Sequence, residues 1–332
     1  MISRVWPKLL VSTALLTWLL ARTPFDSLAR EFARFGLGTV LLGAALSVAA
    51  WLLSALRLRC IAPEFRLAEV ARMTFIGLFY GTVLPGQIAG DVVKAYRLSR
   101  SQQFPGHAVA ATLVDRGIAL LALFVLGAAA AFQVRTAPAE LRVALCVASA
   151  GLALAATLLA MPVLRNILNA LTRITEGRAT RLAAFLEGVA DALRKALLRP
   201  GRMALSMLLA FVFHLICVAI QIVLGERLGI ALTPAAWCLV YAGVSAALLL
   251  PITVAGIGLR EGSYVMLLAL FGVSRESALA LSLVFLGYTL FGALLGGVIE
   301  LRYIATASRP IADEASTKAV CSTSERHRRV MR

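Results

Sequence analysis

The chain has 332 residues, of which 60% are apolar and only 15% are charged, and its mean hydropathy is +0.87. Soluble globular domains carry about 25% charged residues, so this composition excludes a soluble protein and predicts an all-α, polytopic membrane protein. The formal charge of +16 does not indicate nucleic-acid binding, because the basic residues lie mainly between apolar runs. There they report membrane orientation and contact anionic lipid head groups.

Six apolar stretches approach the roughly 20 residues that cross about 30 Å of hydrocarbon. They are residues 5–21, 38–56, 108–132, 140–162, 203–224 and 277–304. Arg4 and Lys8 flank the start of the first stretch, which we expect to be a membrane anchor, because no A-x-A-like cleavage site follows it.

Two shorter stretches, 70–84 and 235–250, reach only about 22–24 Å before a proline interrupts them. Each is followed by a short apolar piece, at 92–98 and 263–271, which predicts two re-entrant helical hairpins. If both stretches turn back and the N-terminus is cytoplasmic, 24 of the 33 basic residues lie on the cytoplasmic side and 7 outside. The positive-inside rule therefore favours hairpins that enter from opposite faces as an inverted repeat, with both chain ends cytoplasmic.

The two predicted hairpins share a sequence element at their tips. LPGQIAGD (84–91) and LPITVAGIGLREG (250–262) both begin Leu-Pro, continue with three residues and then Ala-Gly, and are followed by charge. Proline breaks a helix and glycine permits unusual dihedral angles, so both segments are expected to be irregular at membrane depth. The predicted tip residues are Pro85, Gly86, Gly90, Pro251, Gly256 and Gly258.

Charged residues lie in or beside these embedded segments, although an ionisable group at the bilayer centre costs at least about 2.5–3.5 kcal/mol. They are Asp91, Lys94, Arg97, Asp115, Arg116, Arg260 and Glu261. One interpretation is structural: the Asp115–Arg116 and Arg260–Glu261 pairs neutralise one another, and Lys94 and Arg97 snorkel to the head-group level.

The functional interpretation of the same charges is a lipid head-group site. Arg116, Arg260 and Lys94 would bind a phosphate, because the guanidinium fork contacts two oxygens at once. The acids would orient these cations, with Asp91 and Glu261 holding the two arginines.

The segment 178–198 has an apolar face and a charged face, which predicts an amphipathic helix on the cytoplasmic interface within the loop 163–202. Residues 1–305 are therefore expected to form one integral membrane domain. Residues 306–332 are polar and basic, and we expect a disordered cytoplasmic tail.

No sequence feature indicates an enzyme. The five cysteines have no metal-ligand spacing, and no nucleophilic triad, HExxH motif or P-loop is present, so we expect no cofactor and no metal. His214 lies in the middle of a span, where we expect it to bond to a neighbouring helix, with a proton relay as the alternative.

Three segments carry a resemblance to a known family: FYGTVLPGQIAGDVVKAYRLSR (79–100), ATLVDRG (111–117) and LLLPITVAGIGLREGSYVMLLALFGVSRESALALSL (248–283). Together they resemble the flippase-like membrane region of lysylphosphatidylglycerol synthases, over about residues 5–305. The family often has arginine at the position of Lys94. The positive charge is kept in this chain, but the two-pronged guanidinium group is lost. The chain ends about 30 residues after the last predicted span, so we expect no aminoacyl-transferase domain.

This resemblance implies a bacterial inner-membrane lipid translocase whose cargo is open, since some relatives are linked to hopanoid or glycolipid pathways. We expect an anionic lipid as the bound partner, with a homo-oligomer or a biosynthetic partner also possible. Two alternatives remain: a membrane enzyme that acts on a lipid phosphate through a metal held by the scattered acids, and a non-catalytic scaffold. Dependence on a divalent metal would identify the enzyme.

Overall fold

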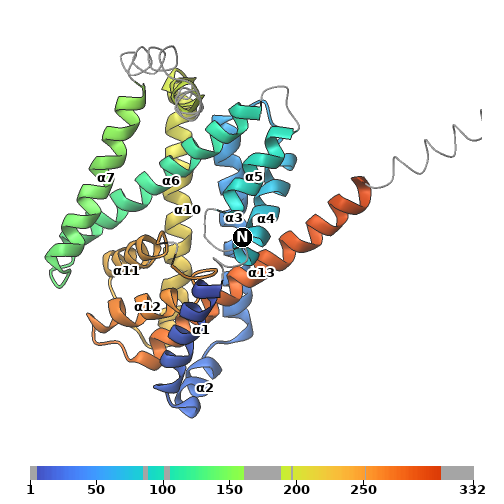
Figure 1. The fold of residues 1–332 in the computed structure, drawn as a ribbon. Helices are drawn as coiled ribbons and strands as arrows, with labels where there is room; N and C mark the ends of the chain where they lie inside the picture. The colour runs from blue at the N-terminus through green and yellow to red at the C-terminus, as the bar shows by residue number, and fades with distance from the viewer. Residues whose placement is uncertain are drawn as a thin grey trace, which may run out of the picture.

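The computed structural model describes residues 6–84, 89–100, 105–160, 188–195, 197–250 and 252–307, and all regular secondary structure in them is α-helical (Figure 1). The helices are α1 (Trp6–Ala21), α2 (Phe25–Ala33), α3 (Leu37–Ile61), α4 (Leu67–Val83), α5 (Ala89–Arg100), α6 (Pro105–Gln133), α7 (Ala139–Ala160), α10 (Pro200–Arg227), α11 (Pro234–Ala247), α12 (Leu259–Ala269) and α13 (Arg275–Ala307).

Five of these helices are long and apolar enough to cross a membrane, namely α3, α6, α7, α10 and α13. They coincide with five of the six predicted spans. The sixth, 5–21, corresponds to α1, which has only 16 described residues and so measures about 24 Å. The all-α, multi-pass class is therefore confirmed.

Two units of broken helix stand where the hairpins were predicted. In the first, α4 and α5 pack side by side, with 17 and 12 residues, and in the second α11 and α12 do so, with 14 and 11. None of the four reaches the length of a full span. The predicted tip residues Pro85, Gly86 and Pro251 lie outside the described residues, and the inverted-repeat relation between the two units stays a prediction.

Glycine brings α4 and α5 into close contact. A β-carbon on Gly90 would lie 2.2 Å from the Gly77 carbonyl oxygen and 3.2 Å from the Gly81 α-carbon. Gly77 and Gly81 are four residues apart, so they lie on one face of α4 and form the small-residue surface on which membrane helices approach closely. The start of α5 is thereby held against the end of α4.

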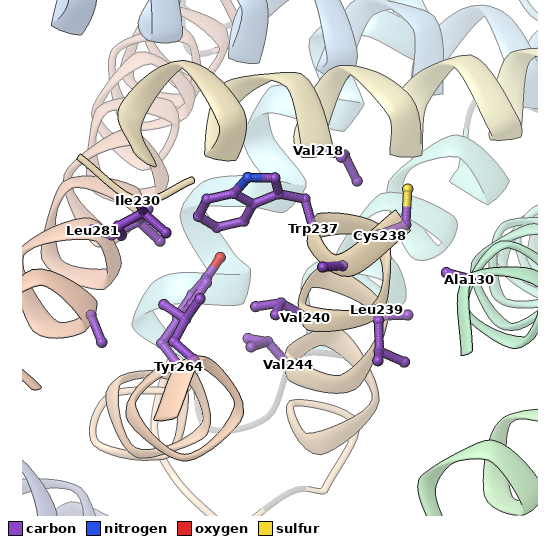
Figure 2. Packing of buried hydrophobic residues seen from close by; sticks show 14 of the residues in the cluster. Ala130, Val218, Ile230, Trp237, Cys238, Leu239, Val240, Val244, Tyr264 and Leu281 are labelled. Atoms are coloured by element: carbon purple, nitrogen blue, oxygen red, sulfur yellow. The ribbon is translucent and has the colours of Figure 1, made fainter. Parts of the chain in front are cut away.

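The second unit packs into an apolar core around Trp237 of α11. Figure 2 shows the indole beside α10, with the Tyr264 ring of α12 pointing toward it. Gly225 on α10 makes room for the indole, because a β-carbon there would lie 2.3 Å from Trp237 Cζ2. Both aromatic residues are at most 2% exposed, and α11 packs against α10 while α12 packs against α11.

Three parts of the chain differ from, or only partly overlap, the sequence-based expectation. The segment 22–37, between the first two predicted spans, contains the short helix α2. Of the predicted interfacial helix 178–198, residues 188–195 are helical, and buried Leu193 packs with residues of α6 and α10, while 178–187 lie outside the described residues. The predicted tail begins inside α13, which continues to Ala307, and residues 308–332 lie outside the described residues.

Replacing Gly296 by alanine is expected to destabilise the bundle by about 1–3 kcal/mol, the usual cost of overpacking. The added carbon would lie 2.0 Å from the Phe75 carbonyl oxygen of α4, which is backbone and can move only with its helix. Gly287→Ala on the same helix is the matched control, because a carbon there meets no atom within 4 Å. Unfolding by SDS titration in detergent micelles measures both, and equal stability of the two variants would contradict the prediction.

Candidate functional site

A cavity of about 270 Å³ opens between the two broken-helix units, and we call it the central cavity. Its wall combines residues of α3, α4, α5, α6, α10, α12 and α13 with Ala255 of the irregular segment that precedes α12. Four of the six predicted head-group residues line it together: Asp91, Lys94, Arg116 and Arg260. Of the described hairpin-tip residues, Gly90 also lines it, whereas Gly256 and Gly258 do not.

Asp91 holds two of the cations in this cavity. Its carboxylate lies 3.0 Å from Lys94 Nζ and 3.3 Å from Arg116 Nη1, so α5 and α6 are joined by charge. The Arg116 side chain is still 36% exposed, which leaves part of its guanidinium open to the cavity. Three cations face one carboxylate in the wall, which is a formal excess of two positive charges.

Arg260 enters the central cavity from the second broken-helix unit and is only partly bonded. Its Nη2 donates to the Ala255 carbonyl oxygen at 3.3 Å, whereas the buried Nη1 has no hydrogen-bond partner among the described residues. Ala255 has a φ of +53°, a strained backbone conformation for a residue with a β-carbon. A buried donor without a partner is costly, so the site is suited to an anion that would accept from it.

Glu261 does not hold Arg260, which corrects the expectation of an Arg260–Glu261 pair. Its carboxylate accepts the Gly258 backbone N–H at 2.6 Å and the Ser282 hydroxyl at 3.3 Å. Gly258 has a φ of +83° and immediately precedes α12 as its N-cap residue, so Glu261 caps the helix of which it is itself a part. Sequence adjacency of Glu261 and Arg260 does not imply an ion pair between them, because adjacent residues of a helix point in different directions.

Asp115 does not pair with its neighbour Arg116 either. Arg57 donates to it twice, from Nε at 2.7 Å and from Nη2 at 3.1 Å, in the two-pronged geometry typical of strong arginine–carboxylate pairs. Sequence analysis missed Arg57, because it follows the apolar run 38–56 and was counted with the cytoplasmic loop. In the structure α3 continues to Ile61, and Arg57 is 4% exposed.

A second cavity of about 250 Å³ adjoins the first and shares Ser54, Arg116 and Phe213 with it. Arg57 lies in its wall, and the buried Arg57 Nη1 has no hydrogen-bond partner among the described residues. Much of the remaining wall is apolar and comes from Leu120, Leu123, Leu248 and Leu249. The two cavities together therefore place cations next to an apolar surface.

His214 borders the second cavity and links three helices, as the predicted bond to a neighbouring helix requires. Its Nε2 lies 2.9 Å from the Ala119 carbonyl oxygen of α6, and its Nδ1 lies 2.9 Å from the Tyr241 hydroxyl of α11. A carbonyl oxygen only accepts, so in the neutral ring Nε2 carries the hydrogen and Nδ1 accepts from the tyrosine. This pattern accounts for His214 as a structural link, and a proton relay stays a prediction.

Glu300 is a further charged residue that sequence analysis missed, within the predicted span 277–304. It is 4% exposed and forms a two-pronged pair with Arg97 of α5, while the Tyr80 hydroxyl donates to it at 3.0 Å. Arg97 is therefore bonded across the bundle. The signal that could have found this pair is a lone acid late in an apolar stretch, which requires a partner.

These groups can bind an anion and are poorly arranged for a metal. Among the residues that the structure describes, no three His, Cys, Asp or Glu side chains come together in a way that could hold a metal ion. The three acids among the predicted site residues bond to different partners: Asp91 bonds to Lys94 and Arg116, Asp115 bonds to Arg57, and Glu261 accepts from the Gly258 N–H.

Replacing Asp115 by asparagine is expected to destabilise the protein by about 3–5 kcal/mol, because Arg57 is left as an uncompensated buried charge. The double variant Arg57→Met/Asp115→Leu removes both charges and should recover most of that loss. Asp191→Asn is the control, since the exposed Lys195–Asp191 pair contributes at most about 1 kcal/mol. SDS titration measures the free energy of unfolding of all three variants. If the double variant lost the summed stability of its two substitutions instead of recovering, the result would contradict the pairing.

Comparison with known proteins gives one match. A family model described as "Lysylphosphatidylglycerol synthase TM region" matches residues 5–297. No curated protein and no solved structure matches the chain. The matched region contains every described residue of both cavities, and it covers far more than half of the chain. The chain therefore belongs to the lysylphosphatidylglycerol synthase TM region family, whose members are membrane proteins linked to lipid synthesis and lipid flipping.

Proposed function

We propose that this protein is a translocase that moves a phosphate-bearing lipid, either a phospholipid or a polyprenyl-linked lipid, across a bacterial inner membrane. The observation that carries the proposal is the central cavity, where Lys94, Arg116 and Arg260 converge from three separate helices on a space that contains one carboxylate. Cations gathered inside an apolar bundle are costly unless they have a task.

The charge and the hydrogen-bond donors of the cavity suit a phosphate head group. An anion would offset the excess positive charge and would accept from Arg260 Nη1, which the protein leaves without a partner among the described residues. Arg116 bridges both cavities, so it could contact a head group in either. The two cavities have volumes of about 270 and 250 Å³, and taken together they are as large as a typical small-molecule site. The apolar wall of the second cavity would accept the carbon chains of a lipid.

The broken helices would provide the motion. In transporters with such helices, gating or rocking of one unit against the rest exposes a central site alternately to the two sides. Here the first unit is held to α13 through Arg97 and Glu300, and the second to α1 through the Val254 N–H, which donates to Ser12 Oγ at 2.9 Å. Movement of either unit would break and remake these polar attachments. We place both chain ends in the cytoplasm, as the distribution of basic residues favours.

Two alternatives are weighed against this proposal. A metal-dependent enzyme would need several carboxylates to converge, whereas Asp115 and Glu261 are bonded to Arg57 and to the start of α12. A scaffold would have no use for the partly bonded arginines of the cavity. Translocation is the function that accounts both for the cations of the central cavity and for the breaks in the helices.

The double variant Arg116→Gln/Arg260→Gln is expected to slow lipid exchange by about 10–100-fold, because each lost charge-assisted hydrogen bond weakens head-group binding. The measurement uses sealed proteoliposomes with fluorescent phosphatidylglycerol, lysylphosphatidylglycerol or a polyprenyl phosphate, and dithionite quenches the outer leaflet. Arg135→Gln/Arg227→Gln is the matched control, because it removes two exposed arginines that lie outside both cavities.

Each result bears on the proposal. Exchange of one lipid that the control keeps and the double variant loses would support translocation and identify the cargo class. Equal exchange in the two variants, or no exchange of any probe by the wild-type protein, would contradict the proposal. Breakdown of a lipid phosphate that requires a divalent metal would instead favour the enzyme. Size-exclusion chromatography of each variant establishes that it is folded before reconstitution.

A further inference from the structure

A third cavity, of about 380 Å³, lies where the end of α3 meets the starts of α6 and α10, and we call it the interface cavity. It shares no lining residue with the central cavity or with the second one. Because it lies at the ends of three membrane-spanning helices, it is at the level of the head groups, where the bilayer meets water.

The rim of the interface cavity is basic and incompletely paired. Lys195 is bonded to Asp191 at 2.7 Å, and the single carboxylate of the described lining, Glu64, is bonded to His107 at 2.8 Å. Arg199 and Arg202 are exposed, and no carboxylate within the described part of the chain forms a salt bridge with either. Two guanidinium groups therefore line this cavity without a counter-charge from any residue that the structure describes.

A buried hydroxyl in the wall indicates a ligand independently of the charge. Ser206 is 1% exposed, and its Oγ has no hydrogen-bond partner within normal distance among the described residues. The neighbouring Cys60 thiol is at most a weak partner. Buried hydroxyls are normally hydrogen-bonded, and Ser206 has only the weak Cys60 sulfur near it, so its hydroxyl could donate to a ligand beside the two arginines.

The start of α10 adds to the same preference. Arg199 is the residue that precedes this 28-residue helix, and no side chain caps the helix. The amino-terminal end of a long helix carries partial positive charge and unused N–H groups, which favour an anion. Ile61, Leu198 and Met203 supply an apolar side to the cavity, which free phosphate would not need and a lipid would cover.

We propose that the interface cavity binds the phosphate head group of an anionic membrane lipid, with Arg199 and Arg202 contacting the phosphate oxygens and Ser206 donating to one of them. The site is separate from the central cavity, and its occupancy does not require that the protein translocate lipid. It would retain anionic lipid beside α3, α6 and α10 at the membrane surface.

The test is binding of short-chain phosphatidylglycerol to the full-length protein in detergent, followed through the half-buried Cys60 thiol, which lies in the wall of this cavity. Bound lipid should slow modification of Cys60 by a methanethiosulfonate reagent, read by mass spectrometry of the Cys60 peptide. Inorganic phosphate and short-chain phosphatidylcholine are the two comparison ligands. Protection at Cys60 reports this cavity alone, so the result does not depend on the fate of the central cavity.

Arg199→Gln/Arg202→Gln is expected to raise the phosphatidylglycerol concentration that gives half protection by about tenfold or more, since two charge-assisted contacts to the phosphate are lost. Ser206→Ala should weaken protection to a smaller extent, and Arg135→Gln/Arg227→Gln should leave it unchanged. Protection equal to wild type in the Arg199/Arg202 variant, or an equal loss in the control pair, would overturn the site. Equal protection by inorganic phosphate or by phosphatidylcholine would overturn the assignment to an anionic lipid.

Discussion

Charge that is buried in an apolar bundle must be bonded, and this constraint organises the centre of the protein. Arg57 on α3 and Asp115 on α6 form a two-pronged pair, and Asp91 on α5 bonds to Arg116 on α6. Because each pair joins two helices, the helices cannot separate without exposing a charge to hydrocarbon. The positions of α3, α5 and α6 around the two cavities follow from these bonds as much as from apolar packing.

The same constraint applies to the backbone wherever a helix is broken at membrane depth. N–H groups released at the second break are bonded by side chains: Ser12 accepts from Val254, and Glu261 accepts from Gly258. Glycine then lets the helices approach, since α1 packs over Gly258 and α4 packs over Gly90. Irregular backbone is tolerated here because the protein itself provides the partners that water would supply elsewhere.

Hydrogen bonding of the arginines that line the cavities is incomplete. Most embedded charges have full partners, yet one nitrogen of Arg57 and one of Arg260 have none among the described residues, and both arginines line cavities. At the membrane surface the interface cavity repeats the pattern with two arginines and one serine. Unpartnered buried groups also lie away from the cavities, at Gln221 and Tyr288, but those at the central and second cavities belong to positively charged arginines, which suits these cavities to bind anions.

The sequence by itself determined the class of the protein and the segments that matter. Apolar length predicts five of the spans, and a proline that ends a short apolar stretch predicts each broken helix. Charge in or beside the membrane-embedded segments identifies Asp91, Lys94, Arg116 and Arg260. Only the tertiary structure decided the partners. Asp115 bonds to Arg57, 58 residues away, Glu300 bonds to Arg97, 203 residues away, and Glu261 caps its own helix instead of holding Arg260. Sequence patterns are local, whereas the partner of a buried charge depends on which helix faces come together in space.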